Sequence, residues 1–177
     1  DYLKLRGHAT VVTREPGGTP IGEKIRQVLL NAEFKNMEPV TELLLYAAAR
    51  CQHVQEVIRP ALEAGKIVLC DRYADATTAY QGAARQMNPK FLKSLHPLAT
   101  GNLKPDLTLL LDCPVEMGLR RVQEREPEIP GLGKLDRFER EKIDFHERVR
   151  QGYLKIAAGE PWRVKVMDAL AEVHTIH

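Results

Sequence analysis

Cysteine is scarce in this chain, and closely spaced cysteines are missing. Only three cysteines occur among 177 residues, and no two of them have a CxxC spacing. A disulfide-stapled secreted domain or a structural zinc site needs several cysteines at short, regular spacings. The sequence therefore argues against both classes. Cys51, Cys70 and Cys113 are expected to be buried small side chains in a reducing compartment.

Long apolar runs and a strong excess of one charge are also missing. No stretch approaches the roughly 20 apolar residues that cross a bilayer, and no signal peptide opens the chain. The chain has 26 Lys and Arg against 24 Asp and Glu, a net charge of +2. Such a small charge does not indicate a nucleic-acid or membrane partner. We expect a soluble, cytoplasmic protein that binds neither.

The apolar residues that are present follow the periods of an α/β fold. Short β-rich or continuously apolar runs predict strands at 8–13, 67–71, 107–112 and 162–167. Apolar residues at helical spacing predict helices at 20–30, 39–65, 89–100, 114–125 and 135–158. Apolar strands that alternate with helices are typical of a parallel sheet covered on both faces. The length predicts one domain over residues 1–177.

Charged residues stand at the ends of three predicted strands. Arg14 and Glu15 follow the first strand, Asp71 and Arg72 end the second, and Asp112 closes the third. In an open parallel sheet, ligands bind outside the carboxyl ends of the strands. A single Asp–Arg pair would more often be a structural salt bridge. Three charged strand ends at one edge favour an anionic ligand, because arginine binds phosphate in a bidentate manner.

A charged residue also interrupts the inward face of the predicted 39–65 helix. Arg50 lies three residues after Ala47 and seven after Leu43, which places it on the apolar stripe. A guanidinium on that stripe needs a polar partner. Tyr46 lies one turn earlier, so the side chains of Tyr46 and Arg50 can face one site.

Five sequence blocks, in order, resemble the bacterial thymidylate kinases, which transfer a phosphoryl group from ATP to dTMP. They are TREPGG at 13–18 with GEKIR at 22–26, ELLLYAAAR at 42–50, DRY at 71–73 with AYQG at 79–82, PDLTLLLD at 105–112, and LDRFE at 135–139. Each block alone is a modest signal, but their order and spacing cover nearly the whole chain. The resemblance implies a three-layer, doubly wound parallel sheet of the P-loop kinase type. It also implies ATP as co-substrate, Mg²⁺ and a homodimer.

The resemblance implies a pocket for the base and sugar of dTMP. Tyr46 matches the aromatic residue that stacks on thymine, and Arg50 matches the arginine that hydrogen-bonds the base. Thr77 and Gln81 match polar groups near the base. Tyr80 matches the ring placed against C2′ of the sugar, which favours deoxyribose. A hydrogen bond to a base edge discriminates well, because a buried unpaired partner is costly.

The resemblance also implies residues that handle phosphate. Arg26 and Arg72 match the arginines that hold the dTMP phosphate. Glu15 and Asp71 match acidic residues that organise this phosphate and the surroundings of Mg²⁺, without a direct metal ligand being identified. The attacking oxygen of dTMP is already anionic, so no general base is needed and catalysis consists of alignment and charge stabilisation. Arg72, Asp71 and Glu15 are therefore predicted catalytic residues.

The segment 126–134 contains two prolines and two glycines and corresponds to the lid that closes over ATP in this family. Arg125 and Arg137 flank this segment and are further catalytic candidates. The alternative for each is a solvated surface arginine. The resemblance leaves the residue that reaches the phosphates open.

One motif of the family does not occur in the sequence. Members open with a strand followed by GxxxxGK[ST], which binds the ATP phosphates, and these 177 residues contain no such motif. A doubly wound sheet without that strand would leave unpaired buried edges. We therefore expect about twenty residues of strand, loop and helix to precede Asp1. The alternatives are an inactive fragment that binds dTMP and a related nucleotide kinase with another acceptor.

Overall fold

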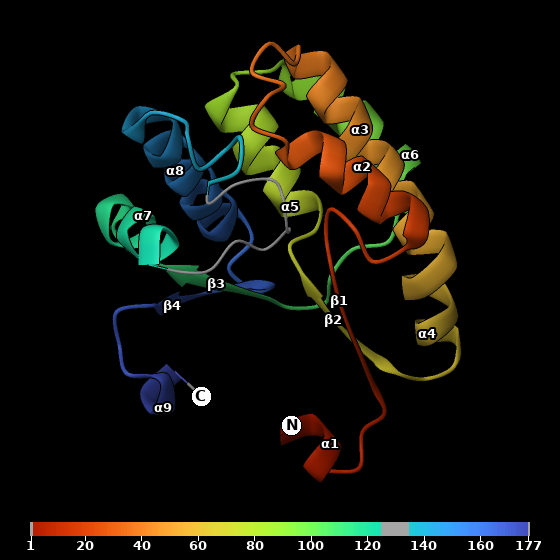
Figure 1. Cartoon of the computed structure of the whole chain (residues 1–177). Helices are drawn as coiled ribbons and strands as arrows, with labels where there is room; N and C mark the ends of the chain where they lie inside the picture. The colour runs from red at the N-terminus through yellow and green to blue at the C-terminus, as the bar shows by residue number, and fades with distance from the viewer. Residues whose placement is uncertain (1, 125–134, 177) are drawn as a thin grey trace.

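The computed structural model describes residues 2–124 and 135–176, and their strands form two parallel pairs (Figure 1). The strands are β1 (Thr10–Arg14), β2 (Ile67–Asp71), β3 (Thr108–Asp112) and β4 (Val164–Asp168). β1 pairs with β2, and β3 pairs with β4. Helices connect the members of each pair, as parallel strands require.

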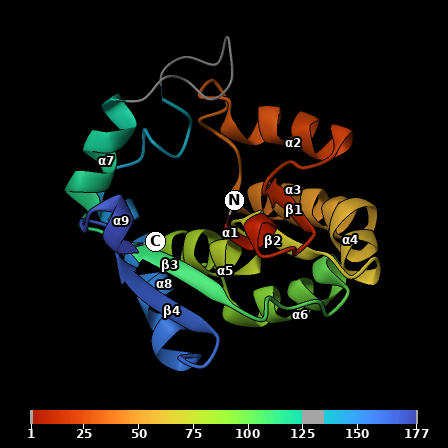
Figure 2. The same cartoon turned by 90° about the horizontal axis from the view of Figure 1, so that it is seen from below.

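Helices precede, connect and follow the strands. In chain order they are α1 (Tyr2–Leu5), α2 (Pro20–Leu30), α3 (Pro39–His53), α4 (Arg59–Glu63), α5 (Ala74–Thr77), α6 (Pro89–Thr100), α7 (Val115–Glu124), α8 (Ile143–Gly159) and α9 (Val173–Ile176). Two π-helical segments, η1 (Val54–Ile58) and η2 (Thr78–Ala84), continue α3 and α5. Figures 1 and 2 place α3 between α2 and α6, with α7 and α8 near β3 and β4.

Local capping explains where two of these helices begin. The Thr19 hydroxyl accepts a hydrogen bond of 2.9 Å from the backbone N–H of Gly22, and Pro20 takes the first position of α2. Asn88 caps α6 through the N–H of Lys90 in the same way. Both residues satisfy backbone donors that a helix start leaves without intrahelical partners.

The hydrophobic core lies where α3, η2 and α8 meet. Its buried members are Leu30, Ala79, Ala84, Phe138, Phe145 and Val149, and three tyrosines pack against them: Tyr46, Tyr80 and Tyr153. Gly152 lets α8 approach η2 closely, because a Cβ at this position would lie 3.0 Å from the Cα of Ala79. The core therefore brings the tyrosines of three separate elements to one place.

The predicted strands and most of the predicted helices are confirmed. One prediction, a helix beginning at residue 135, was wrong, because α8 begins at Ile143. The Asp136 carboxylate accepts hydrogen bonds of 2.8 Å from the N–H groups of Phe138 and Glu139, which forms a separate turn. Side-chain bonds of this kind compete with helix formation.

The prediction of buried cysteines was also wrong. All three are free thiols, but Cys51 is exposed, and Cys70 and Cys113 are only partly buried. Cys51 follows the inward-facing Arg50 by one position in α3, so it points away from the core.

Parallel pairing is confirmed, whereas a single sheet is not formed by residues 2–124 and 135–176. Several apolar strand residues are accordingly open to solvent, with Val12 73%, Leu109 59% and Leu111 58% exposed. No helix in this part of the chain is both long and apolar enough to cross a membrane.

Candidate active site

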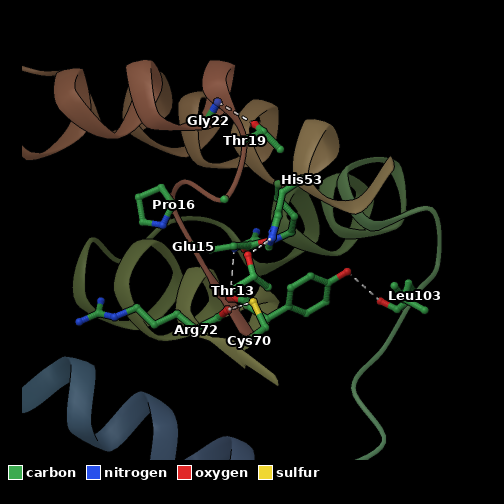
Figure 3. A network of polar contacts seen from close by, with 12 residues as sticks. Thr13, Glu15, Pro16, Thr19, Gly22, His53, Cys70, Arg72 and Leu103 are labelled. Atoms are coloured by element: carbon green, nitrogen blue, oxygen red, sulfur yellow. Dashed lines mark hydrogen bonds and ion pairs between the residues drawn. The ribbon is translucent and has the colours of Figure 1, made fainter. Parts of the chain in front are cut away.

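The carboxyl ends of β1 and β2 meet at one edge, as the sequence predicts. The prediction that Asp112 shares this sheet edge was wrong for the described residues, because β3 pairs with β4 instead. Arg14 lies opposite Asp71 in the register, and the N–H of Glu15 donates a 2.9 Å hydrogen bond to the Asp71 carbonyl. The next residue, Arg72, has φ 65°, a left-handed conformation that is uncommon outside glycine. Its side chain extends away from Glu15 and His53 (Figure 3). Strained backbone at a strand end is often found at functional sites.

Glu15 is the centre of a buried hydrogen-bonded cluster. Its Oε2 accepts a hydrogen bond of 2.7 Å from Arg50 Nε, and its Oε1 lies 3.0 Å from His53 Nδ1. The other ring nitrogen, Nε2, lies 2.6 Å from Thr13 Oγ1 (Figure 3). The side chains of Glu15, Arg50 and His53 are at most 3% exposed. A buried ion pair is costly to break, because one charge then stays uncompensated.

Arg50 has partners on three different segments. In addition to its bond with Glu15, Arg50 donates a hydrogen bond of 3.0 Å from Nη1 to Thr77 Oγ1. Its Nη2 donates a hydrogen bond of 3.1 Å to the carbonyl of Tyr73. The guanidinium carbon also lies 5.4 Å from the centroid of the Tyr73 ring. The sequence prediction that Arg50 is buried and paired is confirmed, and the contacts fix the guanidinium plane between α3 and α5.

A second buried carboxylate, Glu42, was given no role from the sequence. It accepts a hydrogen bond of 2.8 Å from Gln81 Nε2. It also forms ion pairs with Arg137 at 2.6 Å and with Arg85 at 3.2 Å. Arg137 also donates 3.0 Å to the carbonyl of Leu29. Arg137 is 7% exposed, so the alternative of a solvated surface arginine was wrong. The available signal was the presence of Glu42 and Arg137 in two of the five sequence blocks.

Aromatic rings pack beside the Glu42 cluster, where the guanidinium groups of Arg85 and Arg137 lie over the Phe138 ring. The Tyr80 ring meets Phe138 edge-on at a centroid distance of 5.6 Å, and Tyr46 lies 6.1 Å from Phe138. The Arg72 guanidinium lies 5.0 Å from the Tyr80 centroid, within the range of a cation–π contact. Burial raises the pKa of the Tyr46 and Tyr153 hydroxyls, which therefore stay protonated. Three predicted site residues, Tyr46, Arg72 and Tyr80, are thus gathered in one region.

Arg26, on α2, contacts the loop that follows β1. Its Nη1 donates a hydrogen bond of 3.0 Å to the carbonyl of Pro16 in this loop, and Arg26 is buried. A second hydrogen bond joins the same loop to α2, because the Gly18 N–H donates a 3.0 Å hydrogen bond to Glu23 Oε1. Arg26 is therefore held against the loop that carries Glu15. Arg125 and the segment 126–134 lie outside the described residues.

One group of side chains has donors suited to a metal ion. Ligand atoms of Glu15, His53 and Cys70 lie within 4.8 Å of one another. However, Glu15 and both His53 nitrogens already have hydrogen-bond partners, and the Cys70 thiol donates 3.0 Å to the Arg72 carbonyl. Burial raises the pKa of the Cys70 thiol to about 12. A cation would have to displace Arg50, so the contacts favour a hydrogen-bonded cluster.

Asp71 is the better candidate for a ligand of Mg²⁺. This ion prefers oxygen ligands and retains several waters, which a thiol and an imidazole do not suit. The Asp71 carboxylate is exposed at the end of β2. Within the described residues, no hydrogen bond or ion pair to its side chain occurs. Glu15, in contrast, is 4% exposed and committed to Arg50 and His53.

Comparison with known proteins places the whole chain in one family. The family model "Thymidylate kinase" matches residues 1–177. The thymidylate kinase of Syntrophotalea carbinolica is 56% identical over 170 residues, which are 96% of this chain and 78% of that protein. That of Geotalea uraniireducens is 54% identical over 167 residues, 94% of this chain and 78% of that protein.

A solved structure agrees with these relatives. The crystal structure of thymidylate kinase from Ehrlichia chaffeensis superposes with a TM-score of 0.73 at 30% identity, covering 97% of this chain and 76% of that one. The parallel α/β architecture and the Glu15–Arg50 cluster are thus found on a known kinase fold. The chain belongs to the thymidylate kinase family.

Proposed function

We propose that the protein transfers a phosphoryl group from ATP to dTMP, giving dTDP and ADP. The observation that carries this proposal is the fixed Arg50 guanidinium, held by Glu15 and Thr77 on a helix that presents Tyr46 one turn earlier. An aromatic ring next to a positioned donor suits a flat base with an acceptor on its edge. Identities above 50% over most of the chain favour this activity over an inactive dTMP-binding fragment.

The base and sugar would lie among Tyr46, Arg50 and the residues of α5 and η2. We assign stacking on thymine to Tyr46 and the base-edge hydrogen bond to Arg50. Thr77 orients Arg50 through their 3.0 Å hydrogen bond. Gln81 is held by Glu42, so its amide has a fixed orientation near the base. Tyr80 packs against Phe138, where its ring can exclude a ribose 2′-hydroxyl.

The acceptor phosphate would lie beside the ends of β1 and β2. Arg72 is exposed at this edge and is assigned to the phosphate and to the transferring group. Arg26 holds the loop after β1 and is assigned to the phosphate from the other side. Glu15 acts by fixing Arg50. Because the attacking oxygen is already charged, these residues need only align the reactants and stabilise the developing charge.

Mg²⁺ would be held by Asp71, with water molecules, and by the phosphates of ATP. The bound ion neutralises charge on the transferring phosphoryl group. Arg125 and Arg137 remain candidates for the lid region. Arg137 forms an ion pair with Glu42. We therefore assign Arg137 the role of joining the turn at Asp136 to α3.

We further propose that the two parallel pairs, β1–β2 and β3–β4, belong to a single domain over residues 1–177 with the doubly wound architecture of the P-loop kinase type. The exposed apolar residues Val12, Leu109 and Leu111 support this, because strands with both faces apolar occur in sheets covered on both sides. We propose a cytoplasmic homodimer, as the family resemblance implies.

A test of the acceptor separates this proposal from the related-kinase alternative. ADP release by the full-length protein would be measured with ATP, Mg²⁺ and one of four acceptors: dTMP, dUMP, dCMP or thymidine. We expect the highest kcat/KM with dTMP and essentially none with thymidine, which lacks the phosphate that Arg72 and Arg26 are proposed to hold. Preference for dCMP or thymidine would contradict the assignment.

A further inference from the structure

His53 is a fully buried histidine that the site assignment does not use. It ends α3, three residues after Arg50, and its side chain is 0% exposed. Nδ1 lies 3.0 Å from Glu15 Oε1, and Nε2 lies 2.6 Å from Thr13 Oγ1. The ring therefore bridges β1 and the residue that follows β1. Both ring nitrogens have partners, so the ring makes two polar contacts that an apolar side chain of similar size could not make.

The chemistry of the partners determines the tautomer of the ring. Glu15 already receives a hydrogen bond from Arg50, and an ionised carboxylate can only accept. Nδ1 must therefore carry the proton that it donates to Glu15. In the neutral ring, Nε2 is then the acceptor for the Thr13 hydroxyl. A neutral ring with this tautomer satisfies every group of the cluster, and the reversed tautomer would set Nδ1 against the carboxylate without a proton.

The loop after β1 prevents the ring from moving. Gly18 has φ 78°, and a Cβ there would lie 2.6 Å from both Cδ2 and Nε2 of His53 and 2.7 Å from Thr13 Oγ1. The Gly18 backbone thus lies directly against the imidazole (Figure 3 shows the ring beside Glu15 and Thr13). An imidazole held on both nitrogens and on one edge has a single orientation.

We propose that His53 is a positioning residue, which orients the Glu15 carboxylate and through it the Arg50 guanidinium. This rests on the proposed role of Arg50 in binding the base of dTMP. Glu15 is shared by two donors, one on each oxygen. With the Nδ1 bond removed, the carboxylate can rotate toward Arg50 alone, and the Nε–Oε2 geometry changes. Small displacements of binding groups have large effects on the productive geometry.

Two substitutions of His53 separate the two hydrogen bonds. The amide nitrogen of asparagine is as many bonds from Cβ as Nδ1, so His53→Asn can still donate to Glu15. The side-chain amide of glutamine ends as many bonds from Cβ as Nε2, and its oxygen can accept from the Thr13 hydroxyl. His53→Gln can therefore keep the contact with Thr13 but leaves Glu15 without this donor. Both variants remove the aromatic ring and make a comparable change in the core.

The test measures KM for dTMP, KM for ATP and kcat of both variants in the full-length protein. For His53→Gln we expect KM for dTMP to rise about tenfold, since a hydrogen bond to a charged group is lost, with KM for ATP unchanged. For His53→Asn we expect KM for dTMP within about threefold of the unchanged protein. Calorimetric Kd values for dTMP should follow the same order.

A purely structural role predicts a different result. Both variants would then lose similar stability in urea unfolding, and KM for dTMP and ATP would change together or not at all. Equal KM values for dTMP in the two variants would overturn the proposal. His96→Gln is the matched control, because His96 Nε2 also lies near a threonine hydroxyl, Thr78 Oγ1 at 3.1 Å, outside the cluster. Absence of dTMP turnover in the unchanged protein would instead reject the proposed function.

Discussion

Two arginines at the site differ in how their charge is balanced. Arg50 is buried and paired with Glu15, whereas Arg72 is exposed beside the Tyr80 ring. Loss of a buried pair affects folding and function together. Loss of an exposed arginine affects stability little, so its functional effect can be measured separately.

Arg72→Ala tests the proposed stabilisation of the transferring group. We expect kcat to fall roughly 10²- to 10³-fold, because one charged donor is lost from the transition state. The thermal midpoint should change little, since Arg72 is exposed. Arg120→Ala is the control, because Arg120 is also exposed and forms an ion pair with Glu124 on α7. A lower midpoint with unchanged kcat would show that Arg72 has a structural role.

Glu42→Gln tests the second carboxylate cluster. The substitution keeps the shape of the side chain but leaves the buried Arg137 without its anionic partner. We expect the free energy of unfolding to fall by about 3–5 kcal/mol, measured by urea denaturation. Glu124→Gln, in an exposed pair, should change it by less than about 1 kcal/mol. Equal effects of the two substitutions would contradict a structural role for Glu42.

At the scale of elements, the loop between β1 and α2 depends on Gly18. In Gly18→Ala the new methyl group would meet His53 and Thr13, and the positive φ adds strain. We expect a loss of about 2–4 kcal/mol in unfolding free energy. Gly7→Ala separates the two causes, because Gly7 has φ 82° but no atom near its would-be Cβ. It should lose only about 1 kcal/mol, the backbone contribution.

A bidentate ion pair joins β3 to α8. Arg150 donates hydrogen bonds of 2.8 and 2.9 Å to the two carboxylate oxygens of Asp112. These bonds hold the pKa of the Asp112 carboxyl below its usual value. A lowered pKa in the folded state stabilises the protein above the unfolded pKa of about 4, and this contribution is lost as the pH falls through the folded pKa.

Asp112→Asn should therefore be less stable than the unchanged protein at pH 7, by about 1 kcal/mol. The difference should shrink as the pH is lowered below about 4. Urea unfolding at several pH values provides the measurement, and Asp106→Asn, at an exposed aspartate, is the control. A difference that persists unchanged at low pH would contradict the ion pair as its cause.

The elements were more predictable than their connections. Strand residues 67–71 and helices 20–30 and 89–100 were located correctly, because apolar periodicity and capping residues are local signals. The Asp136 turn was missed, because its side chain takes the N–H groups that a helix would need. Glu42 and His53 were missed, because their partners lie far away in the sequence. His53 has a local signal, its spacing of three from Arg50.

At the scale of the whole molecule, binding of dTMP should stabilise the fold. A ligand that binds only the folded state raises the unfolding free energy by about 2.7 kcal/mol at 100 times its Kd. We expect a higher unfolding midpoint in urea with dTMP, and a much smaller change with thymidine at the same concentration. No change with millimolar dTMP would contradict the proposed acceptor site.

The shared Glu15 carboxylate also constrains how this site can evolve. Replacing Glu15 leaves a buried guanidinium and an imidazole without their acceptor at once. Replacing Arg50, or replacing His53 by a residue that cannot donate at the place of Nδ1, leaves one Glu15 oxygen without a donor. No single substitution at these three positions leaves every polar group satisfied. Sequence drift must therefore pass through a less stable intermediate or change two positions together. Among homologues, positions 15, 50 and 53 should covary as one unit, in step with the residue at position 13.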